Sequence, residues 1–293
     1  MKLLFVIPHC CASATRVAKY GSQTGDTNER GMALRQTVLA LHQLLGPSQA
    51  MIQVGARCTI QANQPRRHEL HVCVITNNSD HALEEAALLQ GLFERVVVDV
   101  PPMTLGFACH RVLGDRYVKF DYCGYLEDDL ILHDPWFLEK LIWFNRHVGI
   151  GSVLLPNRFE LSADRAYQKC YLDGDLKPHV TQPFQDVKDE PRLSSKFLGR
   201  SIEFQRPLNP HSGCFFLNAE QMKVWSSRAD FGVAKEAFIG PLESAASLGL
   251  MQTFKVYKPA IGNANFFEIE HHGERFVSKV RKAPSLSMRL LKY

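Results

Sequence analysis

Apolar runs and helix-like repeats alternate along the first half of the chain. Buried strands are predicted where apolar residues are consecutive, at 3–7, 71–76 and 95–100. Helices are predicted where apolar residues recur every three or four positions, at 29–45, 81–91 and 105–120. Strands that alternate with helices predict an α/β fold, with a mainly parallel, Rossmann-like sheet flanked by helices on both faces.

The second half of the chain has a weaker pattern. Segment 160–210 is rich in Asp, Lys, Pro and Ser and predicts a surface loop or a lid over a substrate. Beyond it, an apolar run at 214–217 precedes predicted helices near 219–227 and at 243–250, and an extended segment at 253–257. We expect a single domain over 1–273, followed by a basic amphipathic tail over 274–293.

Composition excludes several classes of protein. An apolar share of 45% and a charged share of 22% are ordinary for a globular chain and exclude disorder or a fibrous repeat. A net charge of +4 is too small to indicate nucleic acid as the partner. No apolar run approaches the roughly 20 residues that span a bilayer, and the N-terminal run predicts a strand instead of a signal peptide. The eight cysteines contain no C-x-x-C pair, so we expect free thiols in a reducing cytoplasm.

Three adjacent acids, Glu127-Asp128-Asp129, follow the apolar pair Tyr125-Leu126. Neighbouring carboxylates repel one another unless a cation or hydrogen bonds compensate. Hard oxygen ligands of this kind suit Mg²⁺ or Mn²⁺ with phosphate oxygens completing the coordination. The alternative is an exposed turn whose carboxylates face water. Ligands of open α/β sheets bind at the carboxyl ends of strands, where this cluster is expected.

Several segments resemble, in their order along the chain, the nucleotide-sugar glycosyltransferases of the GT-A fold. They are the acid cluster and segments 105–111, 211–217, 240–245 and 266–273. The resemblance covers roughly 1–273. It implies a metal-dependent enzyme of polysaccharide biosynthesis that transfers a hexosyl or N-acetylhexosaminyl group from a nucleotide-sugar, expected to be UDP-linked, to a glycan or lipid-linked acceptor.

The same resemblance implies roles at the metal. Asp129 is the expected ligand, and His271 or His272 would add an imidazole, which favours Mn²⁺ over Mg²⁺. Asp128 would support the ion or the ribose, and Glu127 would contact the ribose. Because the cluster reads Glu-Asp-Asp and departs from the plain Asp-x-Asp spacing, the division of roles stays open.

Further residues are candidates for the nucleotide end of the site. Pro8 and His9 follow the first strand and are expected near the base. Arg30 and Arg111 could bind phosphate, because the guanidinium fork holds two oxygens. Arg111 is the preferred candidate because its helix leads to the acid cluster, whereas Arg30 has the simpler interpretation of a solvated helix start.

At the acceptor end, Glu243 is the expected general base of an inverting transfer. Alternatively it only caps its helix, and in a retaining enzyme it would lie near the reacting sugar. Ser212 and Gly213 are expected beside the acceptor, because a residue without a side chain lets the backbone approach a ligand closely.

Other interpretations stay open. A sugar-phosphate nucleotidyltransferase shares the sheet topology, but it should carry a Gly-rich, Arg-bearing loop where this chain reads Pro8-His9-Cys10-Cys11. A non-catalytic GT-A-like protein that binds a glycan or a partner would bind no metal at its carboxylates. The basic tail could dock on the anionic inner face of a membrane, or be a solvated or frayed end.

Overall fold

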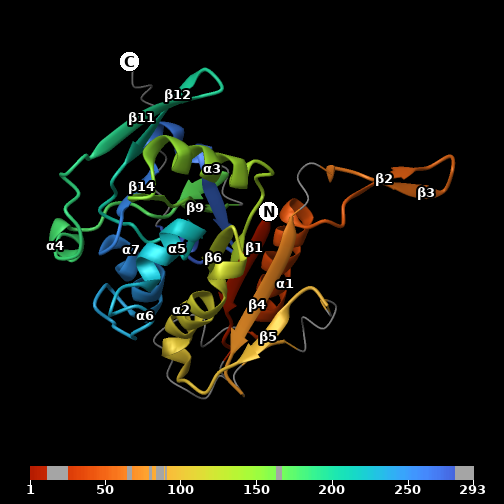
Figure 1. Cartoon of the computed structure of the whole chain (residues 1–293), viewed down its shortest axis with the longest axis horizontal. Coiled ribbons are helices and arrows are strands. Elements are labelled where there is room, and N and C mark those ends of the chain that lie inside the picture. Colours follow the sequence, from red (N-terminus) through yellow and green to blue (C-terminus); the bar gives the residue numbers. More distant parts are fainter. Residues whose placement is uncertain are drawn as a thin grey trace.

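The computed structural model describes residues 1–11, 26–64, 68–78, 81–83, 89, 91–162 and 167–280. Its central sheet has five strands in the order β13-β6-β1-β4-β5 (Figure 1). The strands are β1 (Lys2–Pro8), β4 (Glu69–Thr76), β5 (Glu94–Val97), β6 (Tyr122–Leu126) and β13 (Cys214–Asn218). All neighbours are parallel except β13, which runs antiparallel to β6. The predicted α/β class with a mainly parallel sheet is confirmed.

Both faces of this sheet are buried, because alternate residues of a strand point to opposite faces. Leu3 and Phe5 of β1 belong to one apolar cluster, together with α1 (Thr27–Leu45) and α3 (Phe137–Val148). Leu4 and Val6 belong to a second cluster, together with α2 (Leu105–Arg116) and α5 (Ala219–Ser226). Helices therefore cover both faces, as the alternating pattern predicted.

Two smaller sheets extend the fold. One has the order β11-β12-β14-β8 and contains β8 (Ser152–Leu154), β11 (Arg192–Phe197), β12 (Arg200–Gln205) and β14 (Lys255–Pro259). The other has the order β10-β9-β15-β7 and contains β7 (Leu130–Ile131), β9 (Asn157–Leu161), β10 (Lys169–Tyr171) and β15 (Glu268–His271). Together they bring the ends of β6, β9 and β15 close to one another.

The prediction of a loop over 160–210 was wrong for much of that segment. It contains β10, β11, β12 and the short helix α4 (Pro178–Thr181). In β11 exposed residues alternate with half-buried ones, so the strand carries no apolar run. β11 pairs with β12 as a hairpin across Leu198-Gly199, and the pairing of β12 with β14 is long-range and leaves little local signal.

Several boundaries differ from the prediction. α2 ends at Arg116 and is followed by a 3₁₀ turn, Tyr117–Lys119, and β5 ends three residues early. The helix predicted at 81–91 falls largely outside the described residues. An exposed hairpin of β2 (Ala50–Gln53) and β3 (Cys58–Gln61) was not predicted and extends away from the body of the fold (Figure 1).

The remaining elements are short helical turns. They are η4 (Pro102–Thr104), α6 (Pro241–Glu243), the π-helix η6 (Ser244–Leu248), α7 (Gly249–Met251), η7 (Ile261–Phe266) and η8 (Val277–Lys279). Among the described helices, none has the length and apolar character that crossing a membrane requires. The division into a domain over 1–273 and a tail over 274–293 stays a prediction, and residues 281–293 lie outside the described part.

Candidate active site

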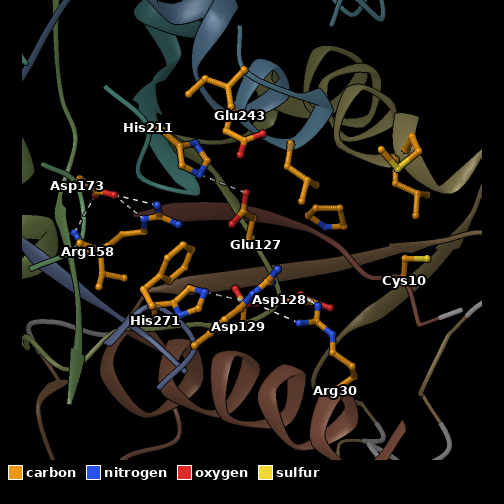
Figure 2. A pocket seen from close by; sticks show the side chains of 18 of the residues that line it. Cys10, Arg30, Glu127, Asp128, Asp129, Arg158, Asp173, His211, Glu243 and His271 are labelled. Atoms are coloured by element: carbon orange, nitrogen blue, oxygen red, sulfur yellow. Dashed lines mark hydrogen bonds and ion pairs between the residues drawn. The ribbon is translucent and has the colours of Figure 1, made fainter. Parts of the chain in front are cut away.

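A pocket of about 320 Å³ lies where β1 and β6 end, and it brings most of the predicted site residues together. Figure 2 shows the acid cluster on its floor, with Glu243 and His211 on one side and Arg30 on another. Its charged and polar lining residues are Arg30, Glu127, Asp128, Asp129, Arg158, Asp173, Asn209, His211, Glu243, His271 and Arg275. Pro8 also lines it, in keeping with its expected place.

Asp128 anchors the acid cluster from below. His9 Nδ1 lies 2.5 Å from Asp128 Oδ2, and Arg30 Nη2 donates to Asp128 Oδ1. The backbone N–H of Ala82 donates to His9 Nε2 at 3.0 Å, so the His9 proton is on Nδ1 and points at Asp128. His9 is fully buried and does not line the pocket, so the structure does not bring it to the cavity, and its expected place near a nucleotide base stays a prediction. Both Asp128 oxygens are engaged within the protein, which contradicts a direct ligand role.

Arg30 is buried, whereas the simpler interpretation of the sequence placed it at a solvated helix start. It lies on α1, where its guanidinium group contacts two members of the acid cluster. Arg30 Nη1 donates to Asp129 Oδ2 at 3.2 Å, in addition to the contact with Asp128. Burial would lower the Arg30 pKa, but the charges of Asp128 and Asp129 raise it, so the side chain stays a cation.

Asp129 is the carboxylate that keeps an oxygen available. Its Oδ2 lies 3.2 Å from Arg30 Nη1 and 3.8 Å from His271 Nε2. Its Oδ1 is buried and has no hydrogen-bond partner among the described residues. Burial alone would raise the pKa of Asp129, but the charges of His271 and Arg30 outweigh it and lower the pKa to about 2. Asp129 is therefore ionised at neutral pH.

The two adjacent histidines separate at the end of β15, where His271 is the last residue of the strand and His272 follows it. His271 is buried and lines the pocket, and its Nδ1 lies 2.9 Å from Glu160 Oε1. Burial would lower the pKa of His271, but Glu160 and Asp129 raise it. His272 contributes only its backbone N–H, to the Asp129 carbonyl oxygen at 2.8 Å, and does not line the pocket. The structure therefore places His271, and not His272, at the pocket, and metal binding by either histidine stays a prediction.

The residues at this end of the pocket fit a divalent ion that also binds a substrate. The described residues contain no cluster of three His, Cys, Asp or Glu side chains that would hold a metal alone. Asp129 Oδ1 and His271 Nε2 offer two ligand atoms, and an ion there would satisfy the buried oxygen that lacks a partner. The other coordination positions would fall to phosphate oxygens or water, as Mg²⁺ and Mn²⁺ sites commonly allow.

Glu127 is the acid whose charge the protein compensates least. Its Oε1 lies 3.8 Å from His211 Nε2 and has no hydrogen-bond partner in the described structure. Burial raises the pKa of Glu127 to about 7, and the charges of Asp129 and Glu243 add to this effect. Gly213, with φ of 62°, makes room for it, because a Cβ there would lie 2.7 Å from Glu127 Oε2. The close approach predicted at Gly213 is thus made to Glu127.

Glu243 lies across the pocket from the acid cluster, on α6, and it is drawn beside His211 in Figure 2. Its Oε2 is buried without a hydrogen-bond partner within the described part of the chain. Burial, with help from the charge of Arg158, lowers the pKa of His211 well below its ordinary value, so this imidazole is neutral. Glu243 thus presents to the cavity a carboxylate oxygen that has no hydrogen-bond partner among the described residues.

Sequence reasoning missed a buried ion cluster beside His211. Arg158 Nε and Nη2 donate to Asp173 Oδ1 at 3.0 and 2.8 Å. Lys258 Nζ donates to Asp173 Oδ2 at 2.9 Å and to the His211 carbonyl oxygen at 2.6 Å. Asp173 lies in the segment predicted to be a loop. The one available signal was Lys258, a charged residue that follows the apolar Val256-Tyr257 of β14.

Two predicted contacts are not at the pocket. Arg111 is exposed on α2, whereas Leu105, nearly two turns earlier on that helix, lines the cavity. Ser212 is fully buried, and its hydroxyl donates to the Pro156 carbonyl oxygen at 2.7 Å. The structure therefore does not bring Arg111 or Ser212 to the pocket, and phosphate binding at Arg111 and acceptor binding at Ser212 stay predictions without support from the geometry.

The sequence matches no protein-family model, and no curated protein is similar enough to count as a relative. The structure is similar to many solved structures, among them the following two. One is S. aureus TarS, at 9% identity and a TM-score of 0.44, over 88% of this chain and 35% of that one. The other is GalNAc-T7 with UDP, GalNAc and Mn²⁺, at 11% identity and a TM-score of 0.47, over 92% of this chain and 43% of that one.

The chain spans less than half the length of either solved structure. Both TM-scores lie below 0.5, so these likenesses carry no activity over to the chain.

The raised pKa of Glu127 predicts a stability effect with a definite sign. Between its ordinary value of 4.5 and about 7, folded Glu127 holds a proton that the unfolded chain has lost, so stability falls as pH rises through this window. We expect Glu127→Gln to unfold at higher urea than the wild type at pH 8 in EDTA, by about 1–3 kcal/mol, and to show no gain at pH 4.5. Urea titrations at both pH values measure this.

The exposed Glu236→Gln serves as the matched control, since that carboxylate faces water. An equal change for Glu127→Gln at both pH values would contradict the buried, uncompensated charge.

Proposed function

We propose that the chain is a metal-dependent glycosyltransferase that moves a hexosyl or N-acetylhexosaminyl group from a UDP-linked donor to a glycan or lipid-linked acceptor. The observation that carries the proposal is the buried Asp129 Oδ1, which lacks a partner among the described residues and shares the pocket with His271 and Glu243. The Asp129 carboxylate can bind a cation on one side of the pocket, and the Glu243 carboxylate can accept a proton on the other. This arrangement suits a reaction in which an anionic group leaves while a hydroxyl attacks.

The donor end of the pocket would be the metal end. Asp129 and His271 would hold the ion, and the imidazole favours Mn²⁺ over Mg²⁺. When bound, such an ion neutralises charge on a diphosphate leaving group. Arg30 keeps Asp129 oriented through its 3.2 Å contact, so its role is to position the carboxylates and not to bind phosphate.

The acceptor end would be the Glu243 end. The acceptor hydroxyl oxygen bonds to the anomeric carbon of the sugar, the bond from that carbon to the phosphate oxygen breaks, and Glu243 takes the hydroxyl proton. His211, drawn beside Glu243 in Figure 2, is neutral because burial lowers its pKa, so it brings no positive charge to this end of the pocket. This assignment makes the transfer inverting, with the acceptor on the face of the sugar opposite the diphosphate.

The proposed setting is the cytoplasm, with the basic tail from residue 274 on the inner face of the membrane. The eight cysteines, all of which the structure describes, form no disulfide. Arg275 and Lys279 lie in the described part of the tail, close to the pocket residue Phe276. These observations support the proposal, and the rest of the tail is outside the described residues.

A thermal-shift panel tests donor binding. We expect UDP with Mn²⁺ to raise the melting temperature of the wild type more than GDP, CMP or ADP, and more than UDP with Mg²⁺ or a chelator. A ligand at 100 times its Kd adds about 2.7 kcal/mol of stability, which is readily measured. Asp129→Asn should lose the shift, because the amide cannot replace the anionic oxygen that faces the ion.

The control is Asp115→Asn, at an exposed position of α2. If no nucleotide shifts the wild type under any condition, the donor proposal is wrong and a non-catalytic binding protein becomes the better hypothesis. An equal shift in chelator would contradict the metal.

Donor hydrolysis, with water as the acceptor, tests the base. We expect Glu243→Gln to bind UDP and Mn²⁺ as the wild type does, but to release UDP from UDP-glucose or UDP-N-acetylglucosamine about 10²–10⁴-fold more slowly. Released UDP is measured by a coupled assay, with Glu236→Gln as the control. Wild-type turnover by Glu243→Gln would exclude its assignment as the base.

A further inference from the structure

Glu160 is a carboxylate that neither the acid cluster nor the proposed reaction accounts for. It lies on β9 and is fully buried. Its oxygens receive two backbone N–H groups: Phe276 N lies 3.1 and 3.0 Å from Oε1 and Oε2, and Val277 N lies 2.7 Å from Oε2. Glu160 Oε1 also lies 2.9 Å from His271 Nδ1. One buried side chain therefore contacts a candidate metal ligand and the segment that follows it.

The contact with His271 selects a tautomer. The contact is an ion pair without a hydrogen bond of ordinary geometry, so it acts through charge. An ionised carboxylate 2.9 Å away repels a lone pair on Nδ1, which favours the neutral tautomer with the proton on Nδ1 and the lone pair on Nε2. Nε2 is the atom that lies 3.8 Å from Asp129 Oδ2. Without Glu160, nothing in the described contacts of His271 would fix the proton at Nδ1.

The contact with the backbone fixes a wall of the pocket. Phe276 lines the cavity, and its ring meets His271 edge to face, with centroids 5.2 Å apart. The Arg158 guanidinium carbon lies 5.8 Å from the centroid of the same ring. Phe276 thus covers the outer side of His271, and its backbone is held by the carboxylate that orients the imidazole.

We propose that Glu160 is a positioning residue that sets the His271 tautomer and the place of the Phe276 wall together, so that metal affinity and the order of segment 276–277 depend on one carboxylate. The metal half rests on the proposed function. The other half, the order of the segment, does not require a metal.

The chain contains a matched comparison for this arrangement. Glu270, next to His271 on β15, pairs with the exposed His133 at 2.5 Å. This is also a carboxylate–imidazole contact, but neither residue lines the pocket in the described structure. Glu270→Gln therefore removes a carboxylate–imidazole contact at the residue next to His271 on β15, without changing a residue that lines the pocket.

The test compares Glu160→Gln with Glu270→Gln in the full chain. With saturating UDP, Mn²⁺ affinity measured by electron paramagnetic resonance should fall about 10–100-fold in Glu160→Gln and stay at the wild-type value in Glu270→Gln. In EDTA, without metal or nucleotide, amide hydrogen exchange at Phe276 and Val277 should be faster in Glu160→Gln alone. Nitrogen-15 spectra of the wild type in EDTA should show His271 protonated at Nδ1.

Either readout unchanged in Glu160→Gln would overturn the proposal, because one carboxylate would then not hold both groups. A wild-type spectrum with the proton at Nε2 alone would also overturn it, and that measurement needs no variant to fold. If wild-type protein binds no Mn²⁺ with UDP, the proposed function fails together with the metal half. Intact Mn²⁺ binding with an unaffected Glu160→Gln would instead overturn this inference alone.

Discussion

The Asp128 carboxylate, held between His9 and Arg30, is the contact on which the rest of the site depends. It joins the end of β1 and the first turns of α1 to the loop after β6. A buried carboxylate is costly unless charge and hydrogen bonds compensate it, and here both of its oxygens are satisfied. Thr37 adds a hydrogen bond to the Asp128 carbonyl oxygen at 3.1 Å. The loop is therefore fixed, and its two outer acids project into the pocket.

That arrangement places the neighbouring acids in different electrostatic surroundings. Asp129 shares the cation Arg30 and faces His271, so its pKa falls to about 2. Glu127, two residues away, is buried without such compensation, and its pKa rises to about 7. Acids whose pKa values are pushed apart in one cavity are typical of sites that move charge or protons. A bound cation would reduce the electrostatic repulsion between these two carboxylates.

The sequence was sufficient for the parts of the fold with local signals. Consecutive apolar residues predicted β1 and β4, and helical spacing predicted α1 and α2, because burial on both faces leaves a clear pattern. The acid cluster was found because carboxylates beside apolar runs are conspicuous, whereas Glu243 and His271 were selected from the resemblance of segments 240–245 and 266–273. Arg158, Asp173 and Glu160 were missed because their roles depend on partners far along the chain.

The choice between His271 and His272, and the choice between Arg30 and Arg111, could be made only from the three-dimensional structure. The end of β15, and not residue type, separates His271, which lines the pocket, from His272, which follows the strand. In the same way the register of α2 directs Arg111 to the surface, while Arg30 reaches the acids from α1. Each of these outcomes depends on which residues of an element face the pocket.

The central claim is that Asp129 and His271 hold a divalent ion beside a nucleoside diphosphate. The most direct measurement is anomalous diffraction at the manganese edge from crystals grown with UDP and Mn²⁺. The account predicts one strong anomalous peak within bonding distance of Asp129 Oδ1 and His271 Nε2, with diphosphate oxygens on its open side. Ordered UDP without a peak at these two atoms, or a peak held by other residues, would contradict it.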